Sequence, residues 1–172
     1  MQLEQALSRQ KSCAQTLIRS FGLSPVMIKS FYPQLLDGHY INPRNDIVFF
    51  KTSIRKESID TYSEHIIEEN ILNALNRRWQ DGNEVCYMNF FPAGKLRTYD
   101  AIIYNIGKRL EVWQEIPFKI SQFAERTYGG NGTIISKRIV YLEYDEVIDH
   151  KFFNIEIPKQ ERSKKPQWKP IK

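Results

Sequence analysis

The sequence predicts an α+β fold with an N-terminal helix-turn-helix-like helical pair, followed by one long helix packed on a largely antiparallel sheet. Apolar residues recur every three or four positions over residues 3–21 and 59–79, as in amphipathic helices. Short runs rich in β-branched and aromatic residues follow from residue 84, separated by turn residues, as in strands. The chain has 172 residues and is 41% hydrophobic, which suffices for one domain with its own core.

The helical pair is predicted from its end signals. Over residues 3–21 the apolar positions fall on one face, and Gly22 follows where a left-handed residue commonly ends a helix. Ser24 and Pro25 supply an N-cap and a first-turn proline for a second helix, which Pro33 should end. In a helix-turn-helix, such a second helix enters the major groove of DNA.

Three segments are expected along the chain: a helical unit at 1–40, an α+β core at 41–157 and a disordered basic tail at 158–172. Within the core, residues 47–54 predict a strand. Residues 59–79 predict the long helix, whose acidic start and basic end suit the helix dipole. Further strands are predicted at 84–91, 96–104, 109–118, 133–144 and 147–157.

Charge is distributed unevenly along the chain. Residues 1–56 hold eight Lys/Arg against three Asp/Glu, and residues 158–172 hold six against one. Residues 57–157, in contrast, hold eleven against sixteen. Basic ends around an acidic middle indicate a polyanionic partner, and duplex DNA is the first expectation.

One stretch also resembles a known family. Residues 13–38, CAQTLIRSFGLSPVMIKSFYPQLLDG, carry a Leu-Ser pair, an Ile-Lys pair, an aromatic residue, a leucine and a glycine in that order. They resemble the DNA-binding segment of the C subunit of the flagellar master transcription regulator, relatives of which act as activators on conjugative plasmids and integrating elements. The matching positions, with a one-residue gap, are Leu23, Ser24, Ile28, Lys29, Tyr32, Leu35 and Gly38. The four-cysteine zinc site of that family has no counterpart here, because the chain has two cysteines.

These observations predict a DNA-binding transcription regulator of a bacterium or mobile element. Its core is expected to form a homo-oligomer, a dimer first, or to bind a partner protein. The residues expected to contact DNA are Arg19, Ser24, Lys29, Ser30, Lys51, Arg55, Lys164 and Lys165.

A second way of reading DNA involves the strand and helix at residues 47–79. Ribbon-helix-helix proteins lay a strand pair in the major groove, where alternate polar side chains touch bases. Lys51, Ser53 and Arg55 alternate in this manner. An ordinary strand and helix of the core would show the same pattern.

The enzymatic alternative is a degenerate metal-dependent nuclease. Asp100 and Glu111 lie on successive predicted strands and, with Glu64 or Glu68, could hold a divalent cation for phosphodiester cleavage. The pattern resembles that of restriction endonucleases, although Trp113 occupies the lysine position of that motif. A third alternative is a non-enzymatic subunit of an assembly on nucleic acid.

Composition argues against several other classes of protein: disulfide-rich, secreted, membrane-spanning and metal-binding. Two cysteines, Cys13 and Cys86, do not form a disulfide framework, and the expected compartment is the cytoplasm. No run approaches 18 apolar residues and the N-terminus does not match a secretory signal, so neither a membrane span nor secretion is expected. The three histidines lack metal-ligand spacing, so no catalytic residue, metal or cofactor is predicted.

Overall fold

The computed structural model describes residues 2–28, 35–56, 58–61, 64–94, 98–124 and 134–154, and the structural statements below refer to these ranges. The helices in them are α1 (Gln2–Ser20), α2 (Glu69–Gln80) and α3 (Gly107–Glu111). The strands are β1 (Val26–Met27), β2 (Gly38–Ile41), β3 (Ile47–Ile54), β4 (His65–Glu68), β5 (Glu84–Pro92), β6 (Thr98–Asn105), β7 (Lys119–Ala124), β8 (Ile134–Leu142) and β9 (Val147–Asn154). Short 3-10 turns lie at Ile59–Thr61, Trp113–Glu115 and Tyr144–Glu146.

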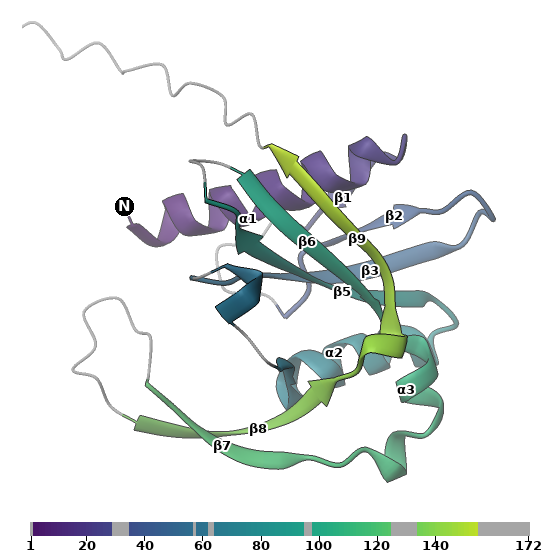
Figure 1. Cartoon of the computed structure of the whole chain (residues 1–172). Coiled ribbons are helices and arrows are strands. Elements are labelled where there is room, and N and C mark those ends of the chain that lie inside the picture. Colours follow the sequence, from purple (N-terminus) through teal and green to yellow (C-terminus); the bar gives the residue numbers. More distant parts are fainter. Residues whose placement is uncertain are drawn as a thin grey trace, which may run out of the picture.

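The strands form two sheets. The main sheet has the order β1-β2-β3-β5-β6-β9, in which β3 and β5 are parallel and all other neighbours antiparallel. The small sheet has the order β4-β8-β7 and is antiparallel. Helix α1 covers one face of the main sheet, while α2, α3 and the small sheet lie on the other face (Figure 1). We call this second face the inner face.

The α1 side of the main sheet is an apolar layer. Helix α1 places its buried residues at spacings of one, three and four, so one stripe of the helix meets the sheet. Strand β5 is buried from Val85 to Phe91 because layers cover both of its faces. The buried residues of this layer include Cys13, Ala14, Leu17, Ile18, Phe50, Met88 and Phe90.

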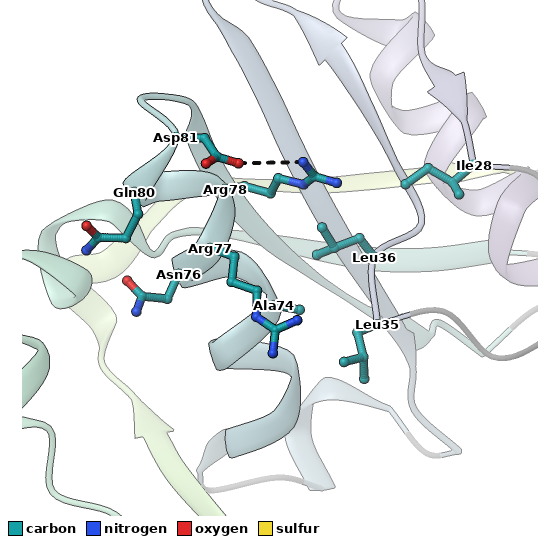
Figure 2. Close-up of a pocket in the computed structure, with 9 residues that line it drawn as sticks. All are labelled: Ile28, Leu35, Leu36, Ala74, Asn76, Arg77, Arg78, Gln80 and Asp81. Atoms are coloured by element: carbon teal, nitrogen blue, oxygen red, sulfur yellow. Dashed lines mark ion pairs between the residues drawn. The ribbon is translucent and has the colours of Figure 1, made fainter.

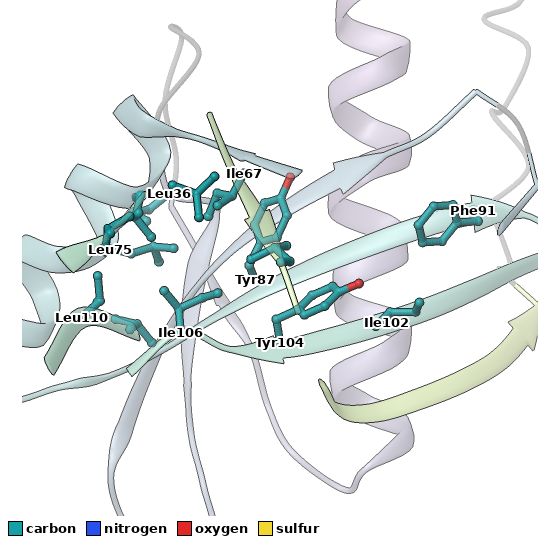
Figure 3. Close-up of a cluster of buried hydrophobic side chains, with 14 residues drawn as sticks. Leu36, Ile67, Leu75, Tyr87, Phe91, Ile102, Tyr104, Ile106 and Leu110 are labelled. Carbon is teal, nitrogen blue, oxygen red and sulfur yellow. The ribbon is translucent and has the colours of Figure 1, made fainter. Parts of the chain in front are cut away.

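A second apolar cluster lies between the inner face and the elements that cover it. It combines side chains of α2, α3, β4 and β8 with those of β5 and β6, several of which are seen in Figure 3. Tyr87 and Tyr104 are directly opposite each other in the register of β5 and β6, and both belong to this cluster. The inner face therefore carries two tyrosine hydroxyl groups within its core.

The structure overturns the predicted N-terminal helical pair. Gly22 does end α1 with a φ of 75°, but Val26 and Met27 then form β1, paired with His39 and Gly38. The serine and proline start signal is outweighed by backbone pairing at the edge of the main sheet, which the local sequence does not report. Lys29 and Ser30, which were expected on the second helix, lie outside the described residues.

The predicted long helix over residues 59–79 is also wrong. This stretch forms a 3-10 turn, strand β4 and then the 12-residue helix α2. Ile66 and Ile67 are β-branched, and β4 pairs with β8, so extended backbone wins over the helical spacing of the apolar residues. The crossover through β4 and α2 makes β5 parallel to β3, because parallel neighbours require such a long connection.

Two further findings concern the helices. The strand predicted over residues 109–118 is replaced by α3 and the 3-10 turn Trp113–Glu115. Within the described ranges, none of the helices combines the length and the hydropathy that crossing a membrane requires.

Candidate nucleic-acid interface

The residues predicted to contact DNA are placed in different environments. Arg19, in the last turn of α1, and Ser24, after it, are exposed. Lys164 and Lys165, like Lys29 and Ser30, lie outside the described residues. The structure therefore brings together only a part of the predicted surface.

Lys51 is engaged in an ion pair with Asp37, the residue that precedes β2. Its Nζ lies 2.9 Å from Asp37 Oδ1, and the two side chains are 15% and 14% exposed. The other oxygen of Asp37 accepts hydrogen bonds from Thr52 and from Gln10 of α1, and Gln10 also donates to the Thr52 carbonyl oxygen at 2.6 Å. This network fixes α1 on β3 and leaves Lys51 turned away from bulk solvent.

Arg55 also points away from the outer surface. It is half-buried, and its Nη2 donates to the backbone oxygen of Ile66 in β4 at 3.0 Å. Lys51 and Ser53 of β3 and Arg55, which follows it, are the alternate polar residues that suggested a ribbon reader. Because Asp37 holds Lys51 and the Ile66 backbone holds Arg55, this stretch does not present a free row of polar side chains to duplex DNA.

The solvent-facing side of α1 has a different character. Between Gln5 and Leu36 the chain contains no Asp or Glu, and it contains Arg9, Lys11 and Arg19 on α1. The intervening polar residues are small or neutral: Ser8, Ser12, Gln15, Thr16 and Ser20. A positive stretch of helix without acids after Glu4 is suited to phosphate groups, which accept hydrogen bonds from arginine, lysine and hydroxyl side chains.

Strand β9 adds a further cation to this surface. Lys151 Nζ donates to Ser20 Oγ at 2.8 Å and lies 4.5 Å from the centre of the Phe21 ring. Phe21 is 41% exposed, so a large aromatic ring stands beside the cations. We call Arg9, Lys11, Arg19, Phe21 and Lys151 the α1 basic face.

Many other basic residues of the described chain form ion pairs with carboxylates, whereas the cations of the α1 basic face do not. Ion pairs join Arg44 to Asp46 and Glu84, Arg78 to Asp81, Arg109 to Glu146, Lys137 to Glu68, and Arg138 to Glu69. In the described part of the chain, none of the four cations of the α1 basic face pairs with a carboxylate. Arg9 lies next to the Tyr99 hydroxyl instead, which leaves its charge uncompensated.

A separate open groove of about 680 Å³ lies beside α2 (Figure 2). Its apolar side consists of Ile28, Leu35, Leu36 and Ala74, and its polar side consists of Asn76, Arg77, Arg78, Gln80 and Asp81. Arg78 is held by Asp81 at 3.6 Å and by the Phe49 ring at 4.7 Å. The Oδ1 atom of Asn76 is buried without a hydrogen-bond partner in the described ranges.

The structure does not assemble the carboxylates of the nuclease alternative. Asp100 lies near the start of β6, where it is 3.4 Å from His150, whereas Glu111 ends α3 beyond the other end of that strand. Asn105 lies five residues further along the strand than Asp100, which corresponds to roughly 16 Å at about 3.3 Å per residue. No group of three or more metal-ligating side chains occurs within the described ranges.

The two cysteines are unsuited to nucleophilic or metal chemistry. Burial raises the pKa of Cys13 to about 12 and that of Cys86 to about 12. Both therefore stay protonated at neutral pH, and the thiolate is the form that attacks electrophiles and binds metals.

Comparison of the chain with protein-family models, characterised proteins and solved structures gives no match. The function is therefore inferred from the surfaces described above. Sequence reasoning missed Arg9, Lys11, Phe21 and Lys151. The acid-free stretch from Gln5 to Leu36 was the available signal for the first three.

Proposed function

We propose that this protein binds nucleic acid, duplex DNA first, through the α1 basic face together with the basic C-terminal segment. The observation that carries the proposal is that the three cations of α1 after Gln5 and the neighbouring Lys151 have no carboxylate partner in the described residues. Cations in this state gain the most from phosphates, because binding releases condensed counterions without breaking existing ion pairs.

The dimensions of the surface support contact with the DNA backbone. Arg9 and Arg19 are ten residues apart on α1, which places them about 15 Å apart along the helix axis. That separation is similar to the width of the major groove, about 12 Å. Since the other side of α1 is buried against the sheet, the helix lies across the phosphates rather than inside the groove. Such contacts position a protein on DNA without reading its sequence.

The C-terminal segment adds further cations in the sequence. Residues 158–172 hold six Lys/Arg against one Asp/Glu. Four residues beyond Asn154 reach Pro158, so this segment begins within about 14 Å of the end of β9. Lys151 of β9 already touches Ser20 of α1. Transcription regulation by an activator of a bacterium or mobile element remains the accompanying prediction from the sequence.

Fluorescence anisotropy with a labelled duplex between 50 and 200 mM salt tests the proposal. The test variant replaces Lys11, Arg19 and Lys151 with glutamine. The control variant replaces Arg44, Arg78 and Arg138, which are held in ion pairs, with glutamine. Because each variant loses three positive charges, the test and control variants have the same net charge. If each lost cation contacts one phosphate, the slope of log K against log salt falls by about 2.7 in the test variant. The control keeps a slope within about one of the wild type.

Two outcomes would overturn the proposal. In the first, both triple variants lose the same affinity, which shows that net charge alone matters. In the second, a chain ending at residue 157 loses all binding, which shows that the α1 basic face takes no part.

A further inference from the structure

The inner face of the main sheet holds a polar cluster that DNA binding does not use. The register of β3, β5 and β6 places Ser53 beside Asn89, and Tyr87 beside Tyr104. Arg55 follows β3 and His65 opens β4, and both reach the same place. Tyr87 and Tyr104 are seen with their hydroxyl groups in Figure 3. We call these six residues, Ser53, Arg55, His65, Tyr87, Asn89 and Tyr104, the inner polar cluster.

Arg55 gives the inner polar cluster a positive charge. One of its donors bonds to the Ile66 backbone oxygen, and no carboxylate of the described residues forms an ion pair with it. Its charge acts on the side chains of His65, Tyr87 and Tyr104. Arginine is seldom buried without a counter-charge, because a guanidinium loses solvation when water is removed.

The neighbours of Arg55 are neutral hydrogen-bonding groups. Burial, aided by Arg55, holds the pKa of His65 below its usual value of 6.5, so its ring is uncharged at neutral pH. Burial raises the pKa of Tyr87 and of Tyr104, so both hydroxyls stay protonated. His65 Nδ1 is hydrogen-bonded to the Tyr104 hydroxyl. The cluster therefore has one positive charge and several groups that can donate to an anion.

Asn89 is a further sign that the cluster is incomplete. Its side chain is fully buried, and neither Oδ1 nor Nδ2 has a hydrogen-bond partner in the described residues. Most buried amides are hydrogen-bonded, and exceptions call for an explanation. Asn89 lies behind Ser53 and Tyr104, whereas Ser53, Arg55 and His65 keep part of their surface in solvent. The cluster therefore meets solvent on the side of these three residues.

We propose that the inner polar cluster binds the carboxylate of a small organic acid. The guanidinium of Arg55 is a planar donor fork that matches two carboxylate oxygens. Ser53 and His65 stand beside it and complete the hydrogen bonds of the anion. Arg55 is the one cation among the six residues, and the carboxylates of Glu68, Asp37 and Glu146 act on Tyr87 and Tyr104 from outside the cluster. Because these acids repel a dianion more than a monoanion, a carboxylate is favoured over a phosphate dianion.

Calorimetric titration and NMR of the full chain test this assignment, with benzoate, acetate and inorganic phosphate as probes. Benzoate is expected to bind saturably to the wild type. Arg55→Gln should weaken its binding at least tenfold, while Arg44→Gln, which alters an exposed arginine, should leave it unchanged. Bound benzoate should raise the pKa of His65, because a negative charge then faces the ring. The resonances of His39 and His150 serve as internal references.

The NMR titration also shows whether Arg55→Gln keeps its fold and whether the guanidinium acts on His65. In folded Arg55→Gln the pKa of His65 should rise without ligand, because the guanidinium that lowers it is gone. The assignment is overturned if none of the three probes binds saturably to the wild type, or if Arg55→Gln binds benzoate as the wild type does. Tighter binding of phosphate than of benzoate overturns the carboxylate class. A failure of DNA binding by the α1 basic face leaves this inference untouched.

Discussion

Replacement of Arg109 by methionine should destabilise the protein far more than replacement of an exposed arginine. Arg109 of α3 donates through Nε and Nη2 to the two oxygens of Glu146 at 2.5 and 2.6 Å. The side chains are only 10% and 8% exposed, and the backbone N–H of Glu143 donates to the same carboxylate at 2.6 Å. This pair holds α3 to the turn that precedes β9.

The expected magnitude follows from what the variant leaves behind. Without Arg109, the Glu146 carboxylate stays buried with one N–H donor, and breaking such a pair costs about 3–5 kcal/mol. The pair between Arg44 and Asp46 is 73% and 44% exposed. Its loss in Arg44→Met should cost only about 0–1 kcal/mol, because water solvates both charges. The contrast between the two variants therefore measures the effect of burial.

Urea unfolding followed by circular dichroism gives the free energies, with both variants compared to the wild type. The melting temperature of Arg109→Met should fall by about 6–20 °C, at roughly 2–4 °C per kcal/mol for a chain of this size. Adding Glu146→Leu should restore part of the loss, because no unpaired charge then remains in the core. A cost of Arg109→Met below about 1 kcal/mol, equal to that of Arg44→Met, would refute the reasoning.

Three further predictions concern single residues. Gly38→Ala should cost about 1–3 kcal/mol in urea unfolding, because the added Cβ would lie 2.5 Å from the Val26 oxygen and 2.7 Å from the Phe50 ring; an unchanged midpoint would contradict the pairing of β1. The free energy of unfolding should fall as pH drops below 6.5, since protonation of His65 favours the unfolded chain, and His65→Gln should flatten this dependence. Asn89→Leu should leave the free energy of unfolding unchanged or raise it, because the unpaired amide is removed; a loss above about 2 kcal/mol would show that the amide is satisfied.

Local signals in the sequence located most elements but not their neighbours. The prediction of a helix over residues 3–21 corresponds to α1, and the strand predicted at 47–54 has the bounds of β3. Gly22 was correctly assigned because a left-handed φ is a local property. The second N-terminal helix failed because β1 depends on pairing with β2, and the long helix failed because β4 depends on β8. Such partners are distant in sequence, so no short window reveals them.

The prediction of candidate binding surfaces was limited for the same reason. Alternation along β3 predicted that Lys51, Ser53 and Arg55 share one face of a strand. It did not reveal whether that face meets solvent or other elements, since either case gives the same pattern. The structure places Lys51 against Asp37 and Arg55 under β4. Lys151 was missed because its contact with Ser20 joins the two ends of the chain.

Strand β3 lies between the two proposed sites, which raises the question of whether they are coupled. Asp37 and Thr52 tie α1 to β3, and the next residues of that strand carry the inner polar cluster. A ligand shifts an equilibrium only by its difference in affinity for two states. β3 is hydrogen-bonded to strands on both sides, and its residues that face α1, Val48, Phe50 and Thr52, are buried, which opposes a shift of the strand. We therefore expect no coupling between the sites.

Saturating benzoate should leave the Kd for duplex DNA within about twofold, whereas allosteric coupling typically changes affinity about 5- to 150-fold. Anisotropy measures this directly, with sodium chloride at the same ionic strength as the control, because any added salt weakens contacts to phosphates. Arg55→Gln separates ligand binding from a salt effect, since it removes the first and keeps the second. A change above fivefold that Arg55→Gln abolishes would contradict this expectation and would mean that β3 moves between two arrangements.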